Sequence, residues 1–151
     1  MINYRISKYN PWFRVNGIYT KEEWTSIGDV GKCFDGKRFT FDEYIAIENN
    51  YVVFVDRIIQ LTKTDLLKIT GLEDDSHNCQ YENGHILRKE EVSSVVRGCL
   101  REEYWCRLVA SSLEISFGYD YYVYAKCSLN YFQMMDMASD LELFVENNPK
   151  E

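Results

Sequence analysis

The sequence LEISFGYDYYVYAKC, residues Leu113 to Cys127, is the stretch around which the fold is organised. It is rich in β-branched and aromatic residues, which suit half-buried pleated surfaces because they pack against cross-strand neighbours at little rotamer cost. Leu113 to Phe117 and Tyr121 to Cys127 are therefore predicted to be strands. Between them, Gly118 permits positive φ and Asp120 can bond its own backbone. This pattern indicates a hairpin turn or a bulge in one bent strand, and we favour the turn.

The second of these strands has two chemically different faces, since side chains alternate across a strand. The smaller, more apolar set belongs to the core. The set predicted to face the core is Tyr121, Val123, Ala125 and Cys127, and the opposite set is Tyr122, Tyr124 and Lys126. Upstream, residues 104–110 (YWCRLVA) also have strand composition, and Ser111-Ser112 is a connection short enough for an antiparallel hairpin. These strands are predicted to form the middle of a sheet.

Helix signals lie on both sides of this centre. Thr40 and Glu43 have the spacing of a capping box, and apolar residues then recur at helical spacing, so a helix is predicted from Phe41 to about Leu61. Further helices are predicted over Lys89 to Leu100 and Leu129 to Ala138, the last with Ser128 as N-cap, and further strands over Ile2 to Ser7, Leu66 to Leu72 and Leu141 to Val145. The order predicts a single α+β domain over residues 1–151, with about three helices covering one face of a mostly antiparallel sheet.

Length and cysteine usage limit the class of protein. A chain of 151 residues is long enough for one core that needs no disulfide or metal. Its five cysteines are an odd, scattered set, and MINYRISKYN lacks the apolar core of a signal sequence, so we expect free thiols and a cytoplasmic protein. The longest apolar run, Tyr51 to Val55, is far shorter than the ~20 residues that span a bilayer. No membrane association is expected.

The charge balance indicates the kind of partner. Acidic residues outnumber Lys and Arg by 24 to 17, giving a formal charge of −7. Direct binding to nucleic acid is not expected, because no basic patch is present to displace counterions. The same charge would steer the chain toward a basic protein, although a moderately acidic surface also serves solubility alone.

The most polar stretch, Glu73 to Gly84 (EDDSHNCQYENG), is predicted to be a mobile loop. His77, Cys79 and His85 lie in or beside it, but their spacing matches no zinc module, so no metal or other cofactor is expected. Its acidic start is either a solvated loop or a docking patch for a cationic surface, and Asp120 among tyrosines is either a turn residue or a contact for Lys or Arg. The predicted partner contacts are Glu73, Asp74, Asp75, Tyr119, Asp120 and Tyr121.

Several blocks of the sequence look familiar together. They are YRISKYNPWFR at Tyr4 to Arg14, EWTSIGDVGK at Glu23 to Lys32, FTFDEYIAIE at residues 39–48, FGYDYYVY at Phe117 to Tyr124, and LFVE at Leu143 to Glu146. These blocks resemble small acidic bacterial proteins that look like immunity proteins of polymorphic or contact-dependent growth-inhibition toxin systems. The resemblance implies a non-enzymatic inhibitor. It would bind a cognate basic toxin domain, such as a nuclease, and block its active site or substrate-binding surface. Independently of the resemblance, the chain is expected to be a monomer or a homodimer, the latter through an exposed edge strand.

Two alternatives remain open from the sequence. A small hydrolase could use Asp or Glu with His85, and this alternative predicts a concave pocket that contains those groups. A regulatory or adaptor module that binds another host protein would have the same composition as an inhibitor. No P-loop, GxGxxG, GxSxG or HExxH motif occurs in the chain.

Overall fold

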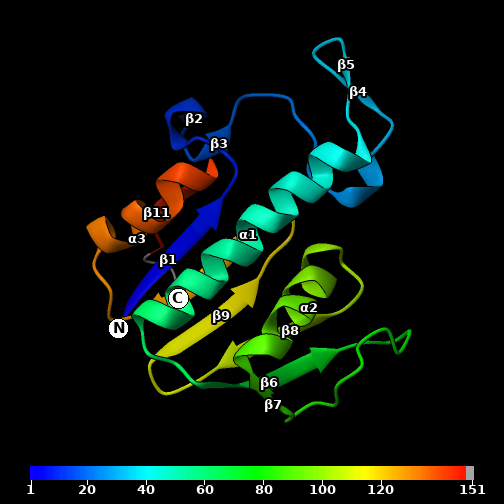
Figure 1. Cartoon of the computed structure of the whole chain (residues 1–151). Coiled ribbons are helices and arrows are strands. Elements are labelled where there is room, and N and C mark those ends of the chain that lie inside the picture. The colour runs from blue at the N-terminus through cyan, green and yellow to red at the C-terminus, as the bar shows by residue number, and fades with distance from the viewer. Residues whose placement is uncertain (149–151) are drawn as a thin grey trace.

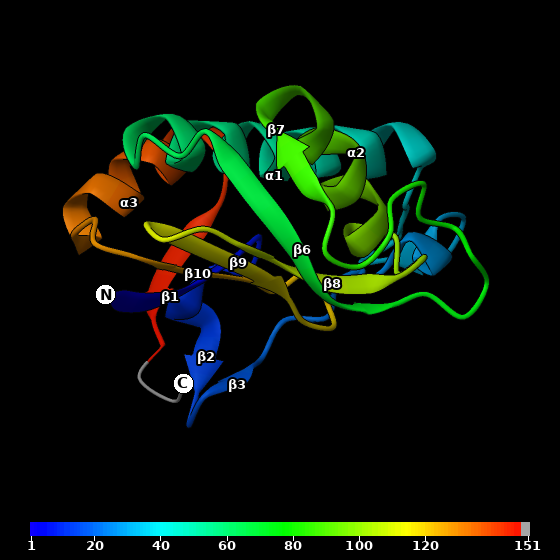
Figure 2. The same ribbon diagram turned by 90° about the horizontal axis from the view of Figure 1, so that it is seen from below.

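A seven-stranded sheet with three α-helices on one face forms the part of the chain that the computed structural model describes, residues 1–148 (Figure 1). The strand order is β11-β1-β10-β9-β8-β6-β7, and every neighbouring pair is antiparallel. The predicted α+β class is therefore confirmed. Figure 2 shows the helices together on one side of the sheet and the β2–β3 hairpin on the other.

The elements have the following bounds. The strands of the large sheet are β1 (Ile2–Ser7), β6 (Leu66–Glu73), β7 (Ile86–Arg88), β8 (Trp105–Val109), β9 (Leu113–Phe117), β10 (Val123–Cys127) and β11 (Phe144–Asn147). The helices are α1 (Phe41–Leu61), α2 (Lys89–Leu100) and α3 (Tyr131–Ala138). Two small hairpins pair β2 (Arg14–Val15) with β3 (Ile18–Tyr19) and β4 (Cys33–Phe34) with β5 (Lys37–Arg38). None of the helices in residues 1–148 combines the length and apolarity needed to cross a bilayer.

The central strands pair as a hairpin, which confirms the predicted turn. Its positive φ angles lie at Asp120 and Tyr121 and not at Gly118, and β10 begins at Val123 and not at Tyr121. β9 and β10 are antiparallel in the register that joins Val123 to Phe117 and Cys127 to Leu113. In the turn, the Tyr122 amide donates to the Tyr119 carbonyl at 3.2 Å, and Asp120 and Tyr121 have φ values of 58° and 66°. Two successive positive φ angles define a type I′ turn, whose twist matches that of the flanking strands.

The core lies between the sheet and the helices. The residues predicted to face it are all buried: Tyr121 in the β9–β10 turn, and Val123, Ala125 and Cys127 of β10. From α1, the Tyr51 hydroxyl donates to the Tyr121 carbonyl at 2.7 Å, and so joins the helix to the β9–β10 turn. α1 begins where predicted, because the Thr40 hydroxyl accepts a hydrogen bond from the Glu43 amide at 3.2 Å.

Two boundaries near the C-terminus differ from the prediction. α3 begins at Tyr131, since Asn130 is its N-cap and exchanges hydrogen bonds with Gln133, so Ser128 is not the cap. The last strand begins at Phe144 because a 3₁₀ turn at Ser139–Leu141 and the positive φ of Glu142 come first. Both corrections come from local caps and turns that the hydrophobic pattern does not show.

The face of the sheet away from the helices is partly covered by the β2–β3 hairpin (Figure 2). Arg14 of the hairpin donates to the Tyr122 hydroxyl at 2.8 Å and lies 3.4 Å from Glu146 of β11. The hairpin therefore covers the β1, β10 and β11 part of this face. Within residues 1–148, no helix or hairpin covers the part formed by β9, β8 and β6 (Figure 2).

Candidate partner-binding surface

Three loops that are distant in sequence meet at one end of the sheet: residues 73–84, 101–104 and 118–122. The Asn78 side-chain amide donates to the Glu103 carbonyl at 3.1 Å, which joins the first loop to the second. Trp105 pairs with Glu73 between β8 and β6, and its ring lies 5.1 Å from the Tyr119 ring in the third loop. The strand order β9-β8-β6 therefore gathers these loops into one surface, which we call the acidic end.

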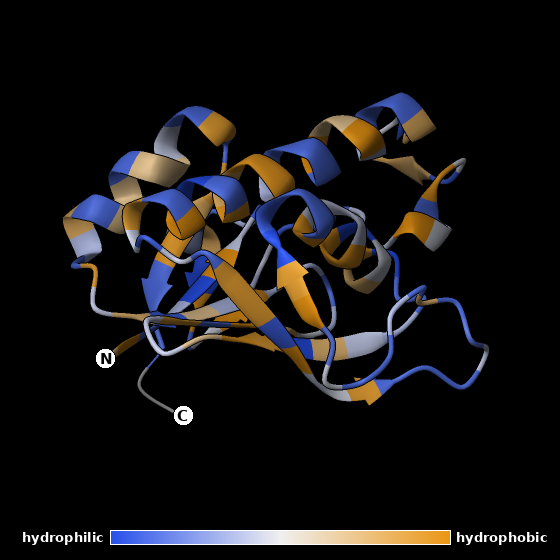
Figure 3. Cartoon of the chain, turned by 60° about the horizontal axis from the view of Figure 1, so that its bottom comes forward, coloured by the Kyte–Doolittle hydropathy of each residue, from blue (hydrophilic) through white to orange (hydrophobic). Residues whose placement is uncertain are grey.

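The acidic end carries an excess of negative charge. Its three loops contain seven acidic residues and one arginine. The arginine, Arg101, turns its guanidinium inward to the buried carboxylate of Glu48. Figure 3 shows the long loop between β6 and β7 as predominantly hydrophilic. The exposed carboxylates therefore face solvent with little local neutralisation.

Large aromatic side chains stand beside these carboxylates. Tyr119 is 73% exposed, although large aromatic rings are usually at least partly covered in folded proteins. Trp105 is half-buried and contacts the Tyr119 ring. Tyr and Trp are enriched at the anchor positions of protein interfaces, so Tyr119 and Trp105 are candidates for such a role.

A groove of about 470 Å³ lies on the open face of the sheet at this end. Trp105, Phe117 and Tyr119 contribute aromatic surface to it, and Arg107 and Glu114 form an ion pair at 2.5 Å within its lining. Next to it, β6 bulges between Thr70 and Glu73, where Gly71 has a φ of 60°. The bulge re-aims the end of β6, so that Glu73 also lines the groove.

The structure brings together part of the predicted contact set. Glu73 and Tyr119 line the same groove, and Asp75 and Asp120 are exposed in the neighbouring loops. Asp74 has another role: its carboxylate accepts the backbone amides of Asn78 at 2.8 Å and Cys79 at 2.9 Å. Asp74 therefore shapes the loop that presents the other carboxylates.

Tyr121 does not belong to the surface, in contrast to the sequence prediction. Its side chain is only 4% exposed, and its ring packs against Trp24, Tyr44 and Tyr51. The type I′ turn places Tyr119 outside and Tyr121 inside. Alternation along the strand had already assigned Tyr121 to the core face, and that assignment is the correct one.

Sequence reasoning missed three members of this surface: Glu102, Glu103 and Trp105. All three lie in REEYW, at the end of α2 and the start of β8, and both glutamates are exposed. The acidic pair before a strand was a visible signal. Its proximity to Glu73 and Tyr119 was not, because it depends on β8 lying between β9 and β6.

The histidines and Cys79 form no compact ligand set. The His85 ring stacks on Tyr81 at 4.5 Å, and its Nε2 lies 3.4 Å from Glu91. Glu91 also accepts the Arg88 backbone amide, and this cap is the main cause of its lowered pKa. Among the histidines, cysteines and acidic residues of positions 1–148, no group of three or more could hold a metal ion.

Comparison with known proteins adds no information about this site. No family model, no curated protein and no solved structure matches this chain. The surface described above, with its carboxylates, exposed rings and shallow groove, is suited to binding a cationic protein surface.

Proposed function

We propose that this chain is an immunity-type inhibitor, which binds a basic toxin domain in the cytoplasm through its acidic end and covers that domain's active site or substrate-binding surface. The observation that carries the proposal is the meeting of three acidic loops around the exposed Tyr119 ring and the neighbouring groove. A nuclease is the kind of toxin that fits, since a surface that binds phosphates must be basic.

Electrostatics would give such an inhibitor fast association. A surface of one sign raises the rate of encounter with an oppositely charged partner well above the ordinary ~10⁵–10⁶ M⁻¹s⁻¹. The exposed carboxylates of Asp75, Glu103 and Asp120 need no rearrangement to act in this way. The first contact would therefore be strongly salt-dependent.

Slow release would come from the aromatic anchors. Interfaces depend on a few well-packed residues, in which Tyr, Trp and Arg are enriched, and Tyr119 beside Trp105 is such a pair. The groove next to them offers a concave surface for a protruding side chain of the partner. The block FGYDYYVY, which contributes to the resemblance to immunity proteins, forms this turn and its flanking strands.

The test begins with the reading frame immediately upstream of the gene for this chain, which the proposal expects to encode the toxin domain. We expect the purified chain to bind that domain with 1:1 stoichiometry in titration calorimetry, and to restore growth to cells that produce it. The double variant Glu103→Lys/Asp120→Lys should weaken binding by at least about 100-fold, because like charges across an interface cost several kcal/mol.

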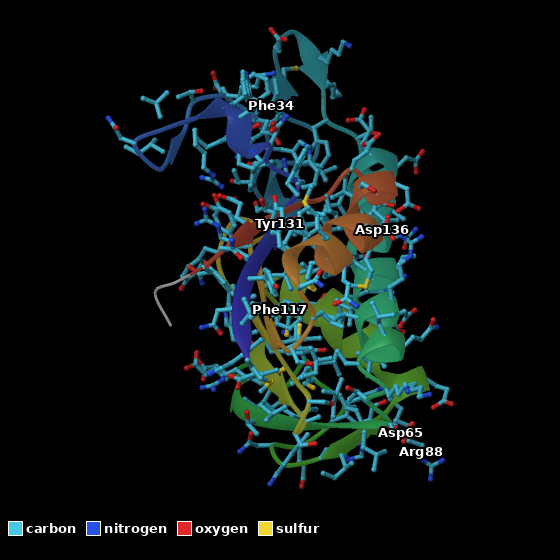
Figure 4. The ribbon with its side chains drawn as sticks, turned by 90° about the vertical axis from the view of Figure 1, so that its left-hand side faces the viewer. Phe34, Asp65, Arg88, Phe117, Tyr131 and Asp136 are labelled. Atoms are coloured by element: carbon cyan, nitrogen blue, oxygen red, sulfur yellow. The ribbon has the colours of Figure 1, made fainter. Side chains whose placement is uncertain are left out.

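The matched control reverses two charges elsewhere on the molecule. Asp136 on the helical side (Figure 4) and Glu142 are both exposed, so Asp136→Lys/Glu142→Lys makes the same change in net charge. This variant should bind the toxin domain nearly as tightly as the unaltered chain at physiological salt. If both variants lose the same affinity for the toxin domain, the effect is one of net charge alone. If Glu103→Lys/Asp120→Lys keeps full affinity, the acidic end is not part of the interface.

A further inference from the structure

A small pocket lies beside the β9–β10 turn, separate from the groove. Its volume is about 190 Å³, below the ~300–1,000 Å³ of ordinary small-molecule sites, so it is the size for one side chain. The residues that line it are Tyr9, Tyr19, Lys21, Thr25, Asp120 and Tyr122. They come from the segment that follows β1, from β3 and the segment after it, and from the β9–β10 turn, and these parts were not combined into a site from the sequence.

Three tyrosine rings form the aromatic part of the pocket. The Tyr9 ring lies between the other two, 5.0 Å from Tyr19 and 5.5 Å from Tyr122. Tyrosine faces carry negative potential and attract cations. The rings already attract the chain's own arginine here: the Arg14 guanidinium lies 5.8 Å from the Tyr19 centroid and 5.5 Å from that of Tyr122.

Three of the chain's cations next to these rings pair with carboxylates: Arg5 and Arg14 share Glu146, and Lys8 pairs with Glu23. Arg14 lies 3.4 Å from Glu146, and Lys8, whose ammonium lies 4.5 Å from the Tyr9 centroid, forms an ion pair with Glu23. The Lys21 ammonium, at the pocket itself, lies 3.7 Å from the centre of the Phe13 ring. Lys8 and Arg14 are therefore paired with carboxylates, whereas the Lys21 contact is with an aromatic ring.

Asp120 supplies the carboxylate in the lining of the pocket. Its side chain is exposed, and no cation of residues 1–148 lies within ion-pair distance of its carboxylate. The residue is held with a φ of 58°, a conformation that non-glycine residues adopt uncommonly, and Tyr121 after it has a φ of 66°.

We infer that this pocket binds the guanidinium group of an arginine side chain supplied by the partner protein. The planar guanidinium stacks on tyrosine rings and pairs with a carboxylate through two parallel hydrogen bonds, whereas an ammonium is a strongly hydrated point charge. The three rings and Asp120 supply both kinds of contact. The inference rests on the proposed function, because it assigns the arginine to the basic partner as its anchor residue.

The probe is N-acetyl-L-arginine methylamide, titrated into the full chain and followed by amide chemical shifts in NMR spectra. We expect saturable binding in the millimolar range, with shifts concentrated at Tyr9, Tyr19, Asp120 and Tyr122. The citrulline analogue, which has nearly the same shape without the charge, and the lysine analogue should each bind at least about tenfold more weakly.

Two variants identify the groups responsible. Asp120→Asn keeps a residue that tolerates positive φ and should reduce arginine binding at least about tenfold. The control Asp75→Asn removes an exposed carboxylate from the 73–84 loop and should leave the binding unchanged. Tyr19→Leu should also weaken binding, because it removes one ring.

Several outcomes would overturn the inference: no saturable shift, equal binding of the citrulline or lysine analogue, or the same loss in Asp75→Asn as in Asp120→Asn. The amino-acid titration needs no toxin, so it separates this inference from the proposed function. If arginine binds but the toxin domain does not, the pocket stands and the proposed function fails. If Asp120→Asn leaves toxin affinity intact, the partner's arginine does not occupy the pocket.

Discussion

The Glu48 carboxylate accepts two hydrogen bonds from the Arg101 guanidinium, at 2.6 and 2.9 Å, and so joins the middle of α1 to the end of α2. Glu48 is fully buried, and it also accepts hydrogen bonds from Arg97 at 2.7 Å and Tyr44 at 3.0 Å. Because Arg101 directly precedes Glu102 and Glu103, this network holds in place one of the three loops of the acidic end.

Removal of the Glu48 carboxylate should destabilise the fold strongly. Breaking a buried ion pair from one side costs about 3–5 kcal/mol, and Glu48→Ala should lie near the lower limit, because Arg97 and Arg101 are partly exposed and can be rehydrated. Urea unfolding followed by circular dichroism measures the change. The exposed helix residue Asp136 provides the control, since Asp136→Ala should change the unfolding free energy by less than about 0.5 kcal/mol. Equal midpoints for the two variants would contradict the role given to Glu48.

The same carboxylate should contribute a pH-dependent part of the stability. Burial by itself would raise the pKa of Glu48, but the hydrogen bonds from Arg101, Arg97 and Tyr44 outweigh it and hold the pKa below the ordinary 4.5. Since the folded state binds this proton less readily than the unfolded state, the contribution is complete above the ordinary value and is lost as pH falls through the lower folded value. The stability difference between the unaltered chain and Glu48→Gln should therefore shrink below about pH 4.5, as measured by urea unfolding across pH. A difference independent of pH would contradict the lowered pKa.

Local signals predicted the helices well. The bounds of α1 and α2 agree with the sequence prediction because the spacing of their apolar residues and their polar first turns are properties of neighbouring residues. The small hairpins and β7 were missed because elements of two or three residues have no period to detect. Strand order could not be predicted in this way, because no local pattern indicates that β8 lies between β9 and β6. The acidic end depends on that order.

Tyr119 and Tyr121 should separate binding from folding. Tyr119→Ala removes an exposed ring and should change the unfolding free energy by less than about 0.5 kcal/mol, whereas Tyr121→Ala empties a core position and should cost about 3–5 kcal/mol. Toxin-domain affinity should fall sharply in Tyr119→Ala. Calorimetric titration and urea unfolding of the same two variants test both statements, and comparable stabilities would contradict the opposite placement of the two rings.

Gly98 should not tolerate alanine, although it lies within α2. In a helix, alanine is ordinarily about 1 kcal/mol more favourable than glycine. Here an added Cβ would lie 2.2 Å from Cζ of Tyr104, whose hydroxyl donates to the Ser94 carbonyl across the same helix. Gly98→Ala should therefore destabilise the fold by about 1–3 kcal/mol, as overpacking does. In a double-mutant cycle with Tyr104→Ala, most of the alanine's cost should disappear, and additive losses would contradict the steric cause.

Thiol reactivity should follow burial. Cys33 is exposed and Cys79 half-buried, whereas Cys99, Cys106 and Cys127 are buried. Burial also raises the pKa of the Cys127 thiol, which lowers its reactive thiolate fraction. A chromogenic disulfide reagent should therefore modify Cys33 rapidly and Cys79 more slowly, and modify the other three only as fast as the fold opens. Cys33→Ser should remove the fast phase alone. Glu48→Ala should speed the modification of the three buried cysteines in proportion to its loss of stability. Rapid modification of more than two thiols in the native protein would contradict the packing of the core between α2 and the sheet.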